Sequence, residues 1–207
     1  MEISTHTHLS DKETWQPLSH YAQVLRAPLF KSETSQGSDP FHVISIMDFP
    51  PAGYLPEPAR TVFLPTRADR ARQYTVKPYD VLITAVGTIG QITIISEECP
   101  DNWIPATNMF VVRFRENQRD LGRAYYGLMK SEFGTRVLRE LSHGSSIKLI
   151  SKKAFARVPL PPCTDDFIAY FISLWEQQED LYTRSQQLLQ EALKVYQAVP
   201  EVVRKGA

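Results

Sequence analysis

The spacing of apolar residues changes along the chain from a strand-like to a helix-like pattern. Short runs rich in β-branched and aromatic residues predict strands at 41–49, 61–65, 81–86, 91–96 and 109–114. From Arg119 to Leu141 apolar residues recur every three or four positions, which predicts helix, and Gly127 and Gly134 favour two short helices hinged near Ser131. This order of elements predicts a mixed α/β (α+β) fold built on a twisted β-sheet.

The segments between these runs carry weaker signals. Residues 15–25 place apolar side chains at a spacing near 3.6 residues, which predicts a short helix or an irregular apolar entry. Residues 147–150 form a candidate strand, and Ser151 is a candidate cap for one helical turn after it. Proline, glycine and charged residues predict loops at 50–58, 66–80 and 100–108.

The clearest element is a long helix after residue 163. Thr164 is a candidate N-cap, and Asp165 and Asp166 suit the first turn because the helix dipole favours acids there. Pro200 ends the pattern. Two neighbouring heptad stripes run along this helix, one of them made of Phe167, Leu174, Leu181, Leu188 and Val195 and the other of Ile168, Trp175, Tyr182, Leu189 and Tyr196.

This helix is about 50 Å long at 1.5 Å per residue. It would extend beyond a globule of the remaining size, so we expect it to pair with a partner helix through its apolar stripes. The alternative is that it folds back over its own domain. Gln178 and Ser185 interrupt the flank of the apolar band, which we interpret as a mark of register. The predicted organisation is a flexible tail (1–13), a globular domain (14–162), the helix (163–200) and a second tail (201–207).

The charges are balanced overall but segregated along the sequence. The chain has 23 basic and 23 acidic side chains, with a pI near 7.0. Residues 113–157 hold eleven basic and four acidic side chains, whereas the regions before 57 and after 163 are mildly acidic. A basic middle suits a polyanionic partner such as nucleic acid. The alternative is an ordinary solvated helix surface that carries lysine and arginine.

Cysteine usage and the apolar pattern bear on the compartment. Cys99 and Cys163 form no CxxC pair, so we do not expect a disulfide framework. We therefore expect the protein to reside in a reducing compartment. The first thirteen residues are polar and do not read as a signal peptide. No apolar run approaches the roughly 20 residues that span a bilayer. We therefore expect a soluble, cytoplasmic protein with no membrane partner.

The loop Gly87-Thr88-Ile89-Gly90 lies between two strand-like runs and raises the question of phosphate binding. A dinucleotide fingerprint or a P-loop needs a longer glycine pattern that passes from a strand into a helix. The residues after Gly90 instead favour a strand, so no helix N-terminus is available for a phosphate. The loop is therefore predicted to be a hairpin turn.

Other motifs that could carry catalysis are incomplete. The stretch DFPPAGY at 48–54 only partly matches the [DN]PP[YF] motif of adenine methyltransferases, because Phe49 separates the acid from the prolines. His6 and His8 have no third metal ligand nearby. HGSS at 143–146 is not a GxSxG nucleophile elbow. We therefore expect no catalytic residue, no metal site and no cofactor in this chain, so it is not predicted to be an enzyme.

Several segments, taken in order, resemble one half of a type I restriction-modification specificity (S) subunit. They are Trp15 with Leu18, FHVISIMDF (41–49), YDVLITAVGTIG (79–90), NMFVVRF (108–114), YYGLMKSEFGTRVLRELSHGSS (125–146), ISKKAFARVPLPP (150–162) and the long helix after them. The resemblance covers nearly the whole chain from Trp15 onward. Each segment alone is a common apolar phrase, and it is their order and spacing that carry the resemblance.

The resemblance implies that residues 14–162 are a target recognition domain that reads a few base pairs. The long helix would then pack antiparallel on its counterpart as a spacer and dimerisation element, held by the methylating and cleaving subunits. The implied partners are double-stranded DNA, an adenine-N6 methyltransferase subunit that carries S-adenosylmethionine, a restriction subunit, and a second S half or a second copy of this chain. Asp165-Asp166 replaces the usual acidic-glutamine pair after PLPP, which is a departure from the family pattern.

The residues themselves suggest where DNA would bind. Arginine matches the O6 and N7 atoms of guanine, and hydroxyl and lysine side chains in loops suit phosphates. The predicted DNA-binding residues come from the basic connector, the glycine loop and the second basic region, and they are Arg60, Arg67, Arg70, Arg72, Gln73, Tyr74, Thr88, Ser145, Ser146, Lys148, Lys152 and Lys153. The alternative for the arginines is surface pairing with Asp69, Asp80 and Glu57.

Two other functions fit the same sequence. One is a stand-alone DNA-binding regulator or phage-defence accessory protein on the same scaffold, which would have no methyltransferase partner. The other is an enzyme with a cofactor site that the motifs do not reveal. Capture of a large catalytic partner separates the first from an S subunit, and stabilisation of the isolated chain by S-adenosylmethionine or a nucleotide would indicate the second.

Overall fold

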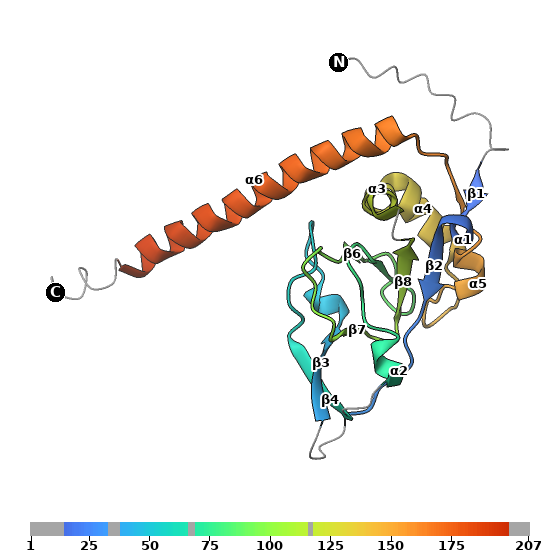
Figure 1. Ribbon diagram of the computed structural model, residues 1–207, viewed down its shortest axis with the longest axis horizontal. Helices are drawn as coiled ribbons and strands as arrows, with labels where there is room; N and C mark the ends of the chain where they lie inside the picture. The colour runs from blue at the N-terminus through green and yellow to red at the C-terminus, as the bar shows by residue number, and fades with distance from the viewer. Residues whose placement is uncertain (1–14, 33–37, 66–68, 116–117, 199–207) are drawn as a thin grey trace. The chain divides into compact units, whose positions relative to one another are not determined.

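The computed structural model describes residues 15–32, 38–65, 69–115 and 118–198, with the backbone alone at 195–198 (Figure 1). It divides into two compact units between Ile168 and Ala169. The first unit is a mixed α/β domain with twisted sheets, as predicted, and the second consists of most of a long helix.

A four-stranded sheet forms the centre of the first unit. Its strand order is β2 (Ala22–Leu25), β8 (Met109–Phe114), β5 (Val81–Thr84) and β6 (Ile92–Ile94), and every neighbouring pair is antiparallel. β5 and β6 are buried along their whole length, because apolar or uncharged side chains occupy every position. Three of these strands confirm the apolar runs predicted from the sequence. Consecutive β5 and β6 form a hairpin, so the glycine loop between them is a turn, as expected.

A second sheet has three strands in the order β4 (Arg60–Pro65), β3 (Ser38–Ile44) and β7 (Trp103–Pro105). β3 pairs antiparallel with β4 and parallel with β7. Alternate residues of β4 are buried, which is typical of a strand with one face on the core. Between the sheets an apolar cluster joins Ile44 to Leu82 and Met109, so the two sheets share one core.

Helices α3 (Arg119–Lys130) and α4 (Glu132–Leu141) follow β8, and their boundary at Ser131 confirms the predicted hinge. α3 packs on β5, β6 and β8. Gly134 is required at the start of α4, because a Cβ there would lie 2.0 Å from the carbonyl oxygen of Met129. The glycine that weakens the helical pattern in the sequence therefore allows the second helix to pack closely against the end of the first.

The two ends of the domain are joined. β1 (Gln16–Pro17) pairs antiparallel with β9 (Pro159–Leu160), and α1 (Leu18–Tyr21) follows β1 directly. The backbone N–H of Leu18 donates to the carbonyl of Val158 at 2.8 Å, and Leu18 is fully buried. The entry segment and the exit segment of the domain therefore lie side by side (Figure 1).

The strand predicted at 41–49 is wrong at both ends. β3 starts at Ser38 and stops at Ile44, and a short 3-10 helix, η2 (Ile46–Asp48), replaces its second half. The Asp48 carboxylate accepts hydrogen bonds from the Ser45 backbone N–H at 2.7 Å and from the Ser45 hydroxyl at 2.8 Å. This capping box turns the chain, and it overrides the alternating pattern that predicts a longer strand.

Four other predictions were incomplete or wrong. The loop predicted at 100–108 contains β7, and the connector predicted at 66–80 contains α2 (Asp69–Arg72). The entry segment contains strand β2 besides the short helix. Residues 147–150 form no strand; Leu149 instead makes isolated bridges to Val86 and His143. Ser151 does cap α5 (Lys152–Phe155), as expected, by accepting from the Ala154 N–H.

The long helix α6 (Asp165–Ala198) has the predicted extent. The hydroxyl of Thr164 accepts from the backbone N–H of Phe167 at 3.2 Å, which confirms it as the N-cap. Within the helix, Phe171 and Trp175 stack with ring centroids 6.3 Å apart. The boundary of the second unit at Ala169 is a few residues inside the helix, so its first turn belongs to the globular domain.

Candidate nucleic-acid interface

Three loops meet beyond the Met109 end of β8, and we call residues 85–90, 106–108 and 143–150 the loop cluster. The backbone N–H groups of Ala85 and Val86 donate to the carbonyl of Asn108 at 2.8 and 3.1 Å. Ile150 donates to the carbonyl of Ala85 at 2.8 Å, and Gly87 donates to that of Lys148 at 2.9 Å. Backbone hydrogen bonds thus fix loops that are far apart in the sequence into one surface.

The segment from His143 to Leu149 is a closed loop. The backbone N–H of each of these two residues donates to the carbonyl of the other, at 3.0 and 2.9 Å. Gly144 has φ +105°, a conformation that L side chains rarely adopt, and a Cβ there would lie 2.2 Å from the carbonyl oxygen of Ile147. Glycine is therefore required for this loop, whose tip at 145–148 is exposed.

The loop cluster gathers four of the predicted DNA-binding residues. Thr88 lies in the turn after β5, and Ser145, Ser146 and Lys148 lie at the tip of the closed loop; all four are exposed. The hydrogen bond from Gly87 to the Lys148 carbonyl connects the two segments. Lys152 and Lys153 follow within a few residues, on α5, and both are exposed. The cluster is thus a surface of hydroxyl and ammonium groups on a backbone fixed by hydrogen bonds.

Arg26 belongs beside the loop cluster and was missed in the sequence. It follows the last residue of β2, and its Nε donates to the carbonyl of Thr107 at 2.8 Å. Its side chain is exposed. No motif in the sequence marks this single arginine, and the strand before it was not predicted. Only the pairing of β2 with β8 brings Arg26 to this end of the sheet.

The predicted residues of the basic connector lie on and after α2, and they differ in availability. Ala71 faces an apolar cluster with Phe41, which holds the short helix on the three-stranded sheet. The Arg72 guanidinium lies 2.9 Å from the Asp39 carboxylate and 5.7 Å from the centre of the Phe41 ring. Within the described residues Arg70 forms no ion pair, and it is exposed. The alternative of surface pairing therefore holds for Arg72, but its partner is Asp39 and not one of the acids expected.

The remaining predicted residues are dispersed. Gln73 is exposed after α2, and the Tyr74 ring packs near Phe30 with centroids 6.2 Å apart. Arg60 begins β4, at the edge of the three-stranded sheet, and it is exposed. Arg67 lies outside the described residues.

Asp80 and Arg113 form an ion pair inside the domain, so Asp80 is not the surface partner that the sequence offered for the predicted arginines. Asp80 is 1% exposed, and its carboxylate accepts from Arg113 at distances from 2.6 to 3.2 Å and from the Lys77 backbone N–H at 2.8 Å. Arg113 also donates to the carbonyl of Thr75 at 2.8 Å. Burial raises the pKa of the Asp80 carboxyl, and the guanidinium offsets part of this rise. The Arg113 side chain is only 17% exposed, and its guanidinium is already bound to Asp80.

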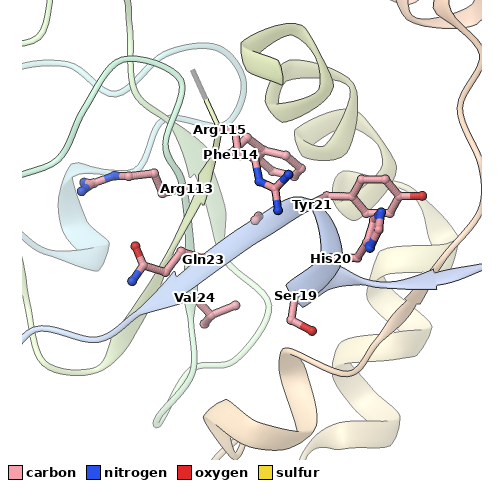
Figure 2. A pocket seen from close by; sticks show the side chains of 9 residues that line it. Ser19, His20, Tyr21, Gln23, Val24, Arg113, Phe114 and Arg115 are labelled. Carbon is pink, nitrogen blue, oxygen red and sulfur yellow. The ribbon is translucent and has the colours of Figure 1, made fainter. Parts of the chain in front are cut away.

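An open depression of about 520 Å³ lies over β2 and β8 at the opposite end of β8 from the loop cluster (Figure 2). Tyr21 and His20 line one part of it with ring centroids 4.9 Å apart, and Arg115 lines another. Burial, and to a smaller extent the charge of Cys163, raises the pKa of Tyr21. None of the predicted DNA-binding residues lines the depression, and we assign it no catalytic role.

The described part of the chain also bears on metal binding and on membrane insertion. It contains no group of three or more histidine, cysteine, aspartate or glutamate side chains placed to hold a metal ion. Among its helices, none is both long enough and apolar enough to cross a bilayer.

The fold is similar to that of solved type I S subunits. The HsdS subunit from Thermoanaerobacter tengcongensis matches with a TM-score of 0.48 and 18% identity over 83% of this chain and 39% of its own. The S subunit of the type I restriction-modification system of M. genitalium matches with 0.53 and 8%, over 84% of this chain and 41% of its own. A chain from a structure on complex assembly and conformational transition of the type I R-M system matches with 0.50 and 20%, over 87% and 42%.

The matches with TM-scores of 0.53 and 0.50 confirm, at the level of fold, the resemblance seen in the sequence. The chain spans about two fifths of the length of each of these proteins. No family model matches the sequence, and no curated protein does. The chain therefore has the fold of part of an S subunit, with one globular domain and one long helix.

Proposed function

We propose that this chain is a non-catalytic DNA-sequence recognition subunit that directs an adenine-N6 methyltransferase to a specific, bipartite site. The observation that carries the proposal is the fold of one half of an S subunit, which extends over 84% of the chain. A module of this kind catalyses no reaction itself. Its role would be to bind DNA and to orient it for the methyltransferase. It would act in the cytoplasm, where its DNA and its catalytic partner are.

The loop cluster supports DNA binding by its chemistry. Thr88, Ser145 and Ser146 offer hydroxyl groups, which donate to phosphate oxygens or base edges. Lys148, with Lys152 and Lys153 on α5, offers positive charge for the phosphate backbone. The backbone hydrogen bonds between the loops hold these groups in place before DNA arrives. Such preorganisation lowers the entropy lost on binding.

Arg70 and Gln73 are the candidates for reading bases on the other basic segment. Arginine binds the O6 and N7 atoms of guanine, and glutamine binds the N6 and N7 atoms of adenine. Both side chains are exposed, Arg70 on α2 and Gln73 directly after it, and Ala71 anchors this short helix to the core. Arg26 joins this set as a candidate that the structure adds.

The long helix supports the second part of the proposal. It presents Leu181, Leu188 and Leu189 with 66, 57 and 52% of their surface exposed, which is unfavourable in water unless a partner covers them. Antiparallel pairing of two such helices joins two recognition domains by a two-fold axis. Two identical domains related in this way read a palindrome in two parts, with a spacer set by the helix pair.

Methylation mapping tests the function directly. The chain is expressed with the genes beside it in a host that lacks adenine methylation at other bipartite sites, and methylated adenines are mapped by sequencing. A single bipartite palindrome is expected, lost when this chain alone is omitted. Methylation that persists without the chain would contradict the proposal. A chain that binds DNA and captures no methyltransferase would instead be the stand-alone regulator.

Removing the α5 charges is expected to weaken DNA binding in a salt-dependent way. The double change Lys152→Ala with Lys153→Ala should reduce the slope of log affinity against log salt by about 2. Each phosphate contact releases about one counterion on binding, so the loss of two contacts lowers the number released by about 2. Fluorescence anisotropy on a duplex of arbitrary sequence at several salt concentrations measures the slope. Arg115→Ala is the control, because Arg115 lies at the far end of β8, and an equal change of slope in it would contradict this assignment.

The two arginines of α2 are expected to differ. Arg70→Ala should weaken DNA binding and reduce the salt slope by about 1, because Arg70 is available for a phosphate or a base. Arg72→Ala should have a smaller effect, because its guanidinium is already bound to Asp39. The same anisotropy titration compares the two variants directly. Unchanged binding in both would place the DNA surface elsewhere.

A further inference from the structure

The apolar band of α6 has a central row that differs from its two heptad stripes. The row is Phe171, Gln178, Ser185 and Ala192. Gln178 follows Leu174 by four positions and Trp175 by three, so on a helix with 3.6 residues per turn it lies between the two stripes. Gln178 and Ser185 are therefore in the middle of the band, and not on its flank as we expected from the sequence.

Polar residues in the middle of an apolar band restrict how that band can be covered. A buried amide or hydroxyl costs free energy unless it finds a hydrogen-bond partner. In helical pairs, a polar residue at a central position selects the register in which it meets another polar residue. The position of Gln178 and Ser185, seven residues apart, therefore carries information about the partner helix.

We propose that α6 pairs antiparallel with the α6 of a second copy in one register, in which Gln178 of each chain lies against Ser185 of the other. The two-fold axis then passes between Leu181 and Tyr182. The antiparallel pairing itself rests on the proposed function, whereas the register is a separate inference from the side chains of this helix.

The central row is self-complementary in this register. Gln178 can donate from its amide to the Ser185 hydroxyl, and the two-fold axis makes this contact twice. Phe171 lies against Ala192, so the largest member of the row meets the smallest. Layers that alternate large and small residues fill the space between helices without voids.

The two stripes and the helix ends obey the same symmetry. The axis keeps each stripe on its own side of the pair, so that each stripe packs on the same stripe of the partner, with Leu181 against Leu181, Tyr182 against Tyr182 and Leu174 against Leu188. Because α6 runs Asp165–Ala198, its midpoint also lies between Leu181 and Tyr182, and the two helices overlap along their full length.

A shift by one heptad in either direction loses these features. In one direction Phe171 meets Ser185, and an aromatic ring covers a hydroxyl. In the other, Gln178 meets Ala192, which offers its amide no side-chain partner. Either shift leaves seven residues of each helix uncovered. The register centred between Leu181 and Tyr182 is therefore the one that satisfies the central row.

Disulfide trapping in the full-length chain tests the register. Cys99 and Cys163 are first replaced by serine, and this background carries either Gln178→Cys or Ser185→Cys, with a different affinity tag on each variant. A disulfide needs Cβ atoms about 3.5–4.5 Å apart, whereas one heptad is about 10.5 Å along the helix. The variants are oxidised separately and as a mixture, and non-reducing electrophoresis measures the shift from monomer to dimer.

The expected result is a disulfide-linked dimer in the mixture that carries both tags, with each variant alone remaining monomeric on the gel. Dimers from Gln178→Cys alone or from Ser185→Cys alone would show a register shifted by one heptad and overturn the proposal. Dimers from both variants separately would show parallel helices and overturn it as well. Sedimentation of the unoxidised background separates these results from a failure of the proposed function, because a chain that stays monomeric at high concentration has no helix pair at all.

Discussion

Replacing Asp80 by asparagine is expected to lower the free energy of unfolding by about 3–5 kcal/mol, because it leaves the largely buried Arg113 guanidinium without its counter-charge. The pair connects β8 to the turn at 75–80, since Arg113 also donates to Thr75 and Asp80 accepts from Lys77. This turn holds Tyr79 at φ 63°, a conformation that is uncommon for a residue other than glycine. Urea denaturation of the full-length chain measures the loss.

The exposed pair of Arg72 and Asp39 provides the matched control. Its atoms lie 2.9 Å apart, compared with 2.6 Å for Arg113 and Asp80, but its side chains are 45% and 35% exposed. Asp39→Asn is therefore expected to cost less than about 1 kcal/mol, because water screens a surface pair. Equal losses in Asp80→Asn and Asp39→Asn would show that the buried pair has no special role in the fold.

Gly144→Ala is expected to abolish most of the DNA affinity while the domain remains folded. A Cβ at this position would lie 2.2 Å from the Ile147 carbonyl oxygen, and the φ of +105° would be strained for alanine. The closed loop from His143 to Leu149 must open to relieve this contact, and strain of this kind costs on the order of 1–3 kcal/mol. Anisotropy titration with DNA gives the affinity, and circular dichroism reports whether the fold is retained.

Gly87→Ala is the control that separates the effect of backbone strain from the effect of opening the closed loop at 143–149. Gly87 also has a positive φ of +81°, but a Cβ there would meet nothing within 4 Å. It should therefore reduce stability slightly and DNA affinity less than Gly144→Ala does. If the Gly144→Ala chain binds DNA as well as the native chain, the closed loop at 143–149 is not part of the DNA surface.

Local sequence patterns predicted the elements whose stability is local. The run at 109–114, the hinge at Ser131 and the cap at Thr164 all appear where the pattern places them, because a buried strand, a helix boundary and an N-cap each depend on neighbouring residues. β7 was missed because it is three residues long and ends in proline, so that only its parallel pairing with β3 defines it. That pairing joins residues about 60 positions apart, which no local pattern encodes.

The same distinction applies to the candidate site. Thr88, Ser145 and Lys148 were expected in exposed loops, and the structure brings them together through backbone hydrogen bonds between two hairpin-like segments. Arg26 and Arg113 could not be placed from sequence. Arg26 reaches the loop cluster only through the pairing of β2 with β8, and Arg113 is turned toward the buried carboxylate of Asp80. The type of side chain was informative, whereas its exposure depended on the tertiary fold.

The short pairing of β1 with β9 has a consequence for how such domains diversify. The chain enters and leaves the globular domain at two paired strands, β1 and β9, so the two ends of the domain lie side by side at a fixed spacing. A different globular domain with the same spacing between its two ends could precede α6 without altering that helix. An exchange of the whole domain at these two strands would therefore leave α6 unaltered, and under the function proposed above it would change the DNA sequence that is read.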